Sequence, residues 1–152
     1  MENYTEEELY KMWINCKRYL GTNQNQQAVD KITMIEEEWD RRMQLPNQTN
    51  QPPNVGLMRF LGYRVGTQNG MTQTHRRNVI NQVMTERLPF YHSPRYMSEW
   101  GEPNTRERYL KLTSFFHGMI NNATGIMEQA LTEWTADLNY LKEKFDSLDS
   151  DK

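Results

Sequence analysis

The side chains best suited to acid–base chemistry lie between residues 92 and 102. His92, Glu99 and Glu102 could form a general acid–base group next to Arg95, since imidazole and carboxyl groups are the usual proton carriers of hydrolases and nucleases. The alternative is that they are ordinary loop residues, which cap helices and pair with arginines. The sequence favours this alternative, because no further catalytic pattern accompanies them.

The other motifs of catalysis are missing from the chain. It has no glycine-rich phosphate loop, no GxSxG nucleophile motif and no HExxH zinc motif. A metal site would have to draw together side chains far apart in the sequence, namely Cys16, His75, His92 and His117. We therefore expect a protein without a catalytic reaction, a cofactor or a bound metal.

A set of cationic and aromatic residues between residues 57 and 108 carries the stronger functional signal. Arginine neutralises phosphates with its planar fork and stacks on flat groups, and aromatic side chains stack on bases. We predict that this set binds nucleic acid or an acidic protein surface. An open alternative places the aromatics in the core and the arginines in internal ion pairs. The candidate binding residues are Arg64, Arg76, Arg77, Arg95, Tyr63, Tyr96, Trp100 and His75.

The charge pattern supports this choice of region. Residues 1–45 contain 6 basic and 9 acidic side chains, residues 46–117 contain 9 and 4, and residues 118–152 contain 3 and 7. A cationic segment thus lies between two acidic ones, although the net charge of the chain is only -2. All three histidines lie in the cationic segment.

The elements that must position these residues are predicted to be helices. Leu and Met outnumber the β-branched Val and Ile, which favours helix because unbranched side chains lose little rotamer freedom there. Thr5 and Glu8 form a capping-box pattern ahead of a first apolar helical face, which Gly21 ends. A second apolar stripe from Ala28 to Met43 predicts an antiparallel helical hairpin within residues 1–45.

The tract 46–54, PNQTNQPPN, has little to bury and reads as a linker or exposed loop. Residues 55–152 then form a helical domain with the cationic segment at its centre, although one compact domain over the whole chain is an equal alternative. Within it we expect a short helix at 55–62 and a turn at Asn69-Gly70, while residues 63–65 could form a strand stub, although the sequence offers it no obvious partner strand.

A clear helix is predicted at about 72–86, with His75, Arg76 and Arg77 in its first turn. Basic residues there oppose the helix dipole unless an anion or an acidic group lies nearby, so this conflict is a hint of function. A further helix opens at Asn104 and is broken near 118–125 by glycines and asparagines. Its second half carries an apolar stripe from Met127 to Phe145, which packs inside the molecule or forms a homodimer.

The sequence thus predicts an all-α fold, in which the N-terminal hairpin packs with a C-terminal long helix or helix pair around an irregular central region. The absence of a long apolar run and of a basic leader leads us to expect a cytoplasmic protein without membrane contact. The second functional hypothesis is an inhibitor or adaptor of the phage or mobile-element type, which binds a host nucleic-acid-processing protein. The third is the small hydrolase or nuclease described above.

Overall fold

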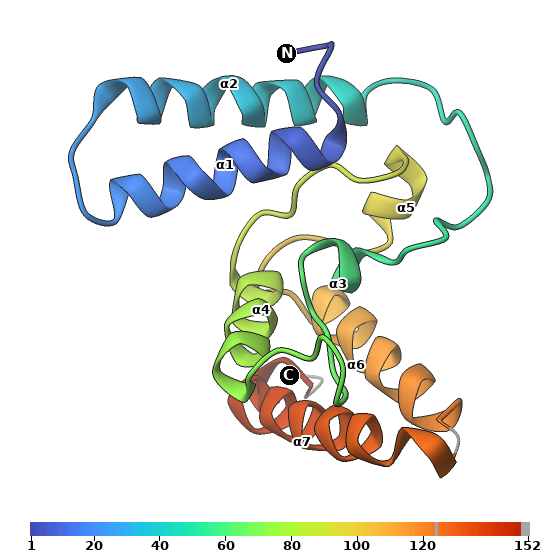
Figure 1. Cartoon of the computed structure of the whole chain (residues 1–152). Helices are drawn as coiled ribbons and strands as arrows, with labels where there is room; N and C mark the ends of the chain where they lie inside the picture. Colours follow the sequence, from blue (N-terminus) through green and yellow to red (C-terminus); the bar gives the residue numbers. More distant parts are fainter. Residues whose placement is uncertain (124, 150–152) are drawn as a thin grey trace. The chain divides into compact units, whose positions relative to one another are not determined.

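The computed structural model is all-α, as the composition predicted, and describes residues 1–123 and 125–149 (Figure 1). None of these residues belongs to a β-strand. The chain forms two compact units: unit 1 is Met1–Asn54 with Pro89–Ser98, and unit 2 is Val55–Leu88 with Glu99–Lys152. The segment Pro89–Ser98, placed by the sequence analysis in the domain 55–152, therefore groups with the N-terminal residues.

Unit 1 is built on an antiparallel pair of helices, α1 (Glu6–Leu20) and α2 (Gln26–Met43) (Figure 1). The predicted capping box is present, because the Thr5 hydroxyl accepts from the Glu8 amide and the Glu8 carboxylate accepts from the Thr5 amide. Trp13 of α1 packs against Trp39 of α2 with ring centroids 5.5 Å apart. The two apolar faces predicted from sequence therefore meet each other.

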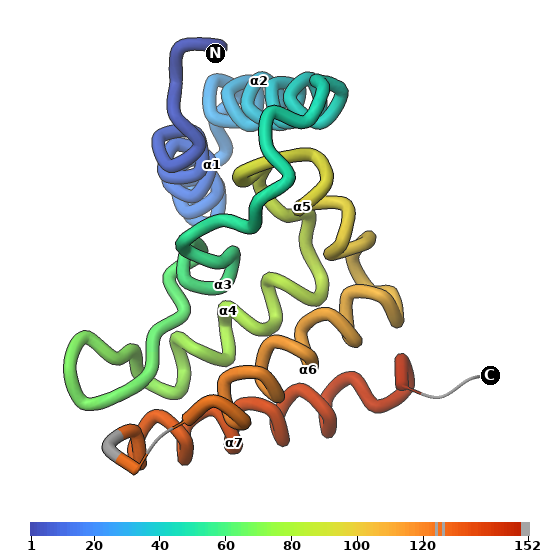
Figure 2. Tube along the Cα trace, turned by 90° about the vertical axis from the view of Figure 1, so that its right-hand side faces the viewer, coloured from blue at the N-terminus to red at the C-terminus, as the bar shows by residue number. Residues whose placement is uncertain are grey.

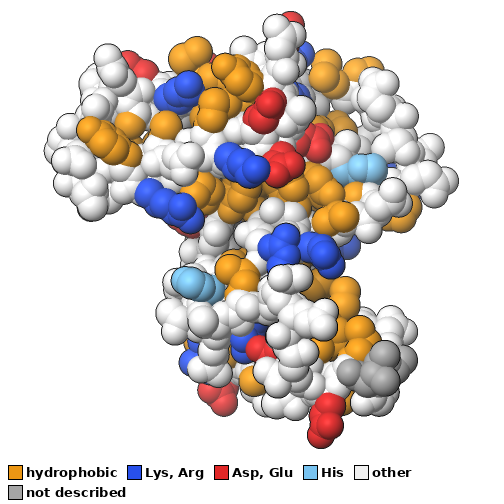
Figure 3. All heavy atoms as spheres, in the orientation of Figure 1, with side chains coloured by type: hydrophobic (Ala, Val, Ile, Leu, Met, Phe, Trp, Pro, Cys, Tyr) orange, Lys and Arg blue, Asp and Glu red, His pale blue; other side chains and the backbone are white. Residues whose placement is uncertain are grey.

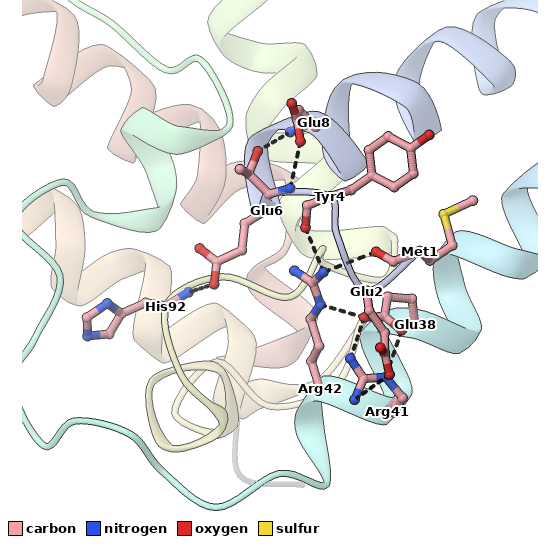
Figure 4. Close-up of polar contacts among 10 residues, drawn as sticks. Met1, Glu2, Tyr4, Glu6, Glu8, Glu38, Arg41, Arg42 and His92 are labelled. Carbon is pink, nitrogen blue, oxygen red and sulfur yellow. Dashed lines mark hydrogen bonds and ion pairs between the residues drawn. The ribbon is translucent and has the colours of Figure 1, made fainter.

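A charged cluster ties the start of the chain to α2 (Figure 4). The buried carboxylate of Glu38 accepts hydrogen bonds from Arg41 at 2.7 and 2.8 Å and from Arg42 at 2.8 Å. Arg42 also donates to the carbonyl oxygen of Tyr4 at 2.7 Å. The hydrogen bonds from Arg41 and then Arg42 outweigh the effect of burial, so the pKa of Glu38 falls to about 2.

The tract 46–54 is hydrogen-bonded to the segment Pro89–Ser98, which contains the short helix α5 (Pro94–Ser98). The amide of Arg95 donates to the Asn47 side chain at 3.0 Å, and the His92 ring nitrogen Nε2 lies 2.6 Å from the carbonyl oxygen of Gln51. His92 also donates its backbone N–H to Glu6 of α1 (Figure 4). Asn47 and Gln51 thus hold the tract to the segment Pro89–Ser98 within unit 1.

Unit 2 is a helical cluster around the antiparallel pair α6 (Arg106–Asn121) and α7 (Glu128–Lys144) (Figure 2). The predicted break lies between them and includes a 3-10 turn, η1 (Gly125–Met127). Helix α4 (Gln73–Thr85) contacts both α6 and α7. The short elements α3 (Leu57–Phe60) and η2 (Asp146–Leu148) complete the described part of the unit. Its core includes Leu57, Met58, Ile80, Val83, Met84, Leu112, Phe116 and Leu141.

Two sequence predictions for unit 2 are corrected. The helix expected to open at Asn104 has Thr105 as its N-cap, because Asn104 adopts a left-handed φ of 59° and donates its N–H to Met84. The strand stub expected at 63–65 does not form, since the Tyr63 side chain is fixed to α7 and no strand is available to pair with it.

The later part of the apolar stripe is buried, with Trp134, Leu138 and Phe145 each less than 10% exposed, whereas Met127 and Leu131 at its start are 40% and 36% exposed. A homodimer through α7 stays a prediction. The packing of the N-terminal hairpin with the C-terminal helices also stays a prediction, because these elements belong to different units. No helix in the described part of the chain has the length and apolarity required to cross a membrane.

Candidate nucleic-acid interface

A network of buried charges fixes the start of α4 to α7. Arg76 places Nε 2.7 Å from an oxygen of Asp137 and Nη1 2.5 Å from Glu133, and Tyr63 donates its hydroxyl hydrogen to Asp137 at 2.5 Å. Arg76 and Tyr63 are each 4% exposed and Asp137 is 0% exposed. A buried ion pair needs such full hydrogen bonding, because desolvation of the charges is otherwise too costly.

The electrostatics of the network keep Arg76 charged. Burial disfavours the charged form, but the hydrogen bond and charge of Asp137, followed by the charge of Glu133, outweigh it and raise the pKa of Arg76. Burial is also the largest cause of the raised pKa of Tyr63, and the neighbouring Asp137 adds to it. Tyr63 therefore stays a neutral hydrogen-bond donor over the whole physiological pH range.

The same network holds the loop 62–71, which leads into α4. Glu133 accepts from the Gly66 amide at 2.8 Å, and Arg76 donates to the carbonyl oxygen of Met71 at 2.8 Å. The loop closes on itself through a hydrogen bond from the Met71 amide to the Arg64 carbonyl oxygen, at 3.0 Å. Its backbone is thus tied to α4 and α7 at several points, which lowers the entropic cost of presenting its side chains to a partner.

Two residues of the loop depend on special backbone geometry. Asn69 has a φ of 61°, as the predicted Asn-Gly turn requires of its first residue. Gly70 needs the absence of a side chain, because a Cβ there would lie 2.2 Å from the Gly66 carbonyl oxygen. The chain bends over residues 66–69, but Gly70 does not adopt the positive φ expected of an Asn-Gly turn, and glycine is needed there for a close approach instead.

Besides Thr67, seven polar side chains of the loop and the first half of α4 are exposed, and none of them bonds to another described residue. We call them the loop–α4 surface. Thr74, His75 and Asn78 share one side of the helix, since residues three and four apart are neighbours. All of these side chains can donate hydrogen bonds, and none is acidic. The surface consists of Arg64, Gln68, Asn69, Gln73, Thr74, His75 and Asn78.

The lack of acidic residues extends well beyond this surface. No Asp or Glu occurs between Asp40 and Glu86, although the chain contains 20 acidic residues. Solvent-exposed helix positions usually carry charges of both signs. A partner with negative charges thus meets no local repulsion from the chain segment that contains the loop and α4.

The structure separates the predicted binding residues of unit 2 into three groups. Arg64 and His75 are exposed. Arg76, Tyr63 and Trp100 are buried, so they support the fold, as the alternative of internal pairing foresaw. Arg77 is half-buried, with its guanidinium 4.5 Å from the centroid of the Tyr140 ring.

The dipole conflict in the first turn of α4 is partly resolved by these contacts. A basic residue in the first turn of a helix is expected to have an acidic group nearby. For Arg76, Asp137 and Glu133 of α7 are these acidic partners. His75 and Arg77 have no such partner among the described residues. The unfavourable position of a cation near the start of α4 therefore suggests a functional role for His75 and Arg77, but not for Arg76.

Arg95 and Tyr96, the remaining predicted binding residues, belong to unit 1. Arg95 is exposed but also reaches Asn50 through Nη1 at 3.4 Å. Tyr96 is half-buried, and its ring lies edge-on to Tyr91 and His92. These two residues hold unit 1 together and are not part of the loop–α4 surface.

The candidate acid–base residues are likewise divided between the units. His92 lies in unit 1, whereas Glu99 and Glu102 lie in unit 2, where Glu99 pairs with Lys111 at 3.1 Å. Within residues 1–123 and 125–149, no group of three or more His, Cys, Asp or Glu side chains is placed to hold a metal ion.

Most of the loop–α4 surface was not predicted, because the predicted binding residues were mainly arginines and aromatics. Gln68, Asn69, Gln73, Thr74 and Asn78 were not predicted, and the signal that could have found them is the stretch without carboxylates. On the face drawn in Figure 3, basic side chains form separate groups rather than one continuous patch. The candidate interface is therefore mainly polar, with few cations.

Comparison with known proteins adds no functional information: no family model, curated protein or solved structure matches the chain.

Proposed function

We propose that the protein binds nucleic acid through the loop–α4 surface of unit 2, as a non-catalytic interaction protein. The observation that carries the proposal is a set of exposed hydrogen-bonding side chains without a carboxylate, on a backbone tied down by a buried network. Asn and Gln side chains match the edge of adenine, Arg matches that of guanine, and Thr can contact either.

The role of each residue follows from its chemistry and position. Asn78 and Thr74, four residues apart on one side of α4, would contact base edges, and Arg64 would neutralise a phosphate or contact guanine. His75 is exposed at the start of α4 and can donate a hydrogen bond to a phosphate oxygen. Arg76, Tyr63, Asp137 and Glu133 position this surface from inside unit 2 and do not touch the partner.

Fluorescence anisotropy with short labelled single-stranded and duplex DNA and RNA tests the proposal at about 50 mM and about 200 mM salt. Replacing one base contact and one possible phosphate contact, in the double variant Arg64→Ala with Asn78→Ala, should weaken binding by at least about tenfold. The matched control is Asn15→Ala with Arg18→Ala, which removes the same residue types from exposed positions on α1 of unit 1.

The two double variants should differ clearly if the surface is correct. Equal affinity of both variants, or no binding of any of the nucleic acids at the lower salt concentration, would contradict the proposal. Retention of a stoichiometric protein partner after nuclease treatment, together with absence of nucleic-acid binding, would favour the inhibitor or adaptor instead.

The exposed apolar residues of α2 give the inhibitor or adaptor hypothesis little support. The exposed apolar side chains of α2, Val29 and Met34, are 41% and 52% exposed but five residues apart in the helix. Five residues correspond to about 140° around the axis, so the two do not form one patch. Single exposed apolar residues are normal on protein surfaces.

A further inference from the structure

A second cationic site lies on the other edge of α4, where this helix runs beside α7 (Figures 1 and 2). Arg77 of α4 lies over the ring of Tyr140 of α7 at 4.5 Å. Lys144, one turn further along α7, lies 5.6 Å from the centroid of the same ring. Two cations thus share one aromatic side chain.

Hydrogen bonds fix the geometry of this group. The Tyr140 hydroxyl donates to the side-chain oxygen of Asn81 at 3.0 Å, and Lys144 donates to the Tyr140 hydroxyl oxygen at 3.2 Å. Asn81 lies one turn after Arg77 on α4, so both helices contribute two residues each. The ring is therefore fixed at its hydroxyl, by Asn81 of α4 and by Lys144 of its own helix.

Neither cation is neutralised by a carboxylate among the described residues. Arg77 makes no hydrogen bond or ion pair there, and its Nε, which is buried, has no acceptor. Stacking on the Tyr140 ring satisfies one side of the guanidinium and leaves the terminal Nη groups as uncommitted donors. Lys144 is exposed, and the Tyr140 hydroxyl is its only polar partner among the described residues.

Arg77 differs from Arg76 and Arg108, the two buried arginines of unit 2. Arg76 pairs with two carboxylates, and buried Arg108 donates to the carbonyl oxygens of Trp100, Gly101, Val83 and Glu86. Both are committed to the fold. Arg77 instead has an oriented guanidinium with free donors beside a second cation, Lys144. The two positive charges repel each other unless an anion is bound between them.

We infer that Arg77 and Lys144, spaced by Tyr140, form a phosphate-binding subsite that grips the backbone of the nucleic acid contacted by the loop–α4 surface. This inference rests on the proposed function and adds the residues that carry its sequence-independent part. A planar guanidinium fork and an ammonium group both bind the non-bridging oxygens of a phosphodiester. Base contacts specify a sequence, whereas this subsite positions the strand for every sequence.

The salt dependence of binding tests the subsite separately from the rest of the surface. In the full chain, Lys144→Ala removes an exposed side chain and should lower the slope of log affinity against log salt by about one. The loss of affinity should be the same for oligonucleotides of different sequence. Lys142→Ala is the matched control, because Lys142 is exposed on the same helix but lies about 200° away around its axis.

A second readout follows Arg77 directly. Its Nε–H resonance, assigned by its loss in Arg77→Lys, should shift on titration with inorganic pyrophosphate and with the oligonucleotide. A shift with both probes supports the subsite as a general phosphate site, and a shift with the oligonucleotide alone supports it as a backbone site.

The outcomes separate the two proposals. If nucleic acid binds but Lys144→Ala has the same slope as Lys142→Ala and the Arg77 resonance does not move, the subsite is wrong and the loop–α4 surface stands. If no nucleic acid binds and pyrophosphate leaves the Arg77 resonance unchanged, both are overturned.

Discussion

Arg76 and Arg77 are adjacent in the sequence and have the same chemistry, yet the fold uses them differently. The side chain of Arg76 is buried against Asp137 and Glu133, whereas that of Arg77 lies across the edge of α4 on Tyr140. One residue along a helix corresponds to about 100° around its axis, which is enough to change a structural ion pair into a surface cation. The identity of the residue alone could not distinguish these roles.

The buried network around Asp137 should make a large contribution to stability. Asp137→Ala leaves the buried Nε of Arg76 without its carboxylate partner and removes the acceptor of the Tyr63 hydroxyl, so we expect the free energy of unfolding to fall by about 3–5 kcal/mol. Urea unfolding of the full chain measures this. Glu143→Ala, an exposed acidic position on the same helix, should change it by less than about 0.5 kcal/mol.

Glu38 should make the protein sensitive to acid. Its pKa in the folded chain is about 2, below the usual value of 4.5, so its contribution to stability is fully present above about pH 5. This contribution is lost as the pH falls from about 4.5 toward 2. Glu38→Gln should lower the free energy of unfolding by about 1–3 kcal/mol at neutral pH and by progressively less in acid.

Urea unfolding of the wild type and Glu38→Gln at a series of pH values checks this prediction. A difference between the two that stays constant down to about pH 2 would show that the carboxylate charge of Glu38 does not stabilise the fold.

At the scale of elements, α4 and the loop before it depend on glycine at one close approach. Gly70→Ala places a Cβ against the Gly66 carbonyl oxygen, so we expect a loss of about 1–3 kcal/mol of stability and weaker nucleic-acid binding. Gly118→Ala is the contrasting variant, because no atom lies within 4 Å of its Cβ and it is inside α6. It should raise stability by about 0.5–1 kcal/mol, as alanine favours helix.

Thermal unfolding distinguishes these two glycine variants by the sign of the change in melting temperature. A rise in melting temperature for Gly70→Ala would mean that the loop relaxes without cost and is not held as described.

The helices could be predicted from sequence because their signals are local. The capping box at Thr5, the break near Gly118 and Gly125 and the apolar faces of α1 and α2 all depend on neighbouring residues. The N-cap of α6 was predicted one residue early because it depends on a bond from Asn104 to Met84, 20 residues away. The sequence left open whether Tyr63 and Trp100 are buried, since distant partners decide it.

At the scale of the whole molecule, net charge would not by itself attract the proposed nucleic-acid partner. Unit 2 contains 11 basic and 11 acidic residues, and unit 1 contains 7 and 9. The cationic and acidic segments seen in the sequence neutralise each other within unit 2, partly through Arg76 with Asp137 and Glu133. Attraction to a nucleic acid must therefore come from the local arrangement of residues, and it should respond strongly to a few substitutions.

Mapping of backbone amide shifts by NMR, on titration of the full chain with the tightest-binding oligonucleotide, tests the central claim most directly. The account predicts the largest shifts within residues 64–78, with further shifts near Arg77, Tyr140 and Lys144, and little change in α1 and α2. Shifts concentrated in α1 and α2, or no shifts in residues 64–78 despite binding, would contradict it.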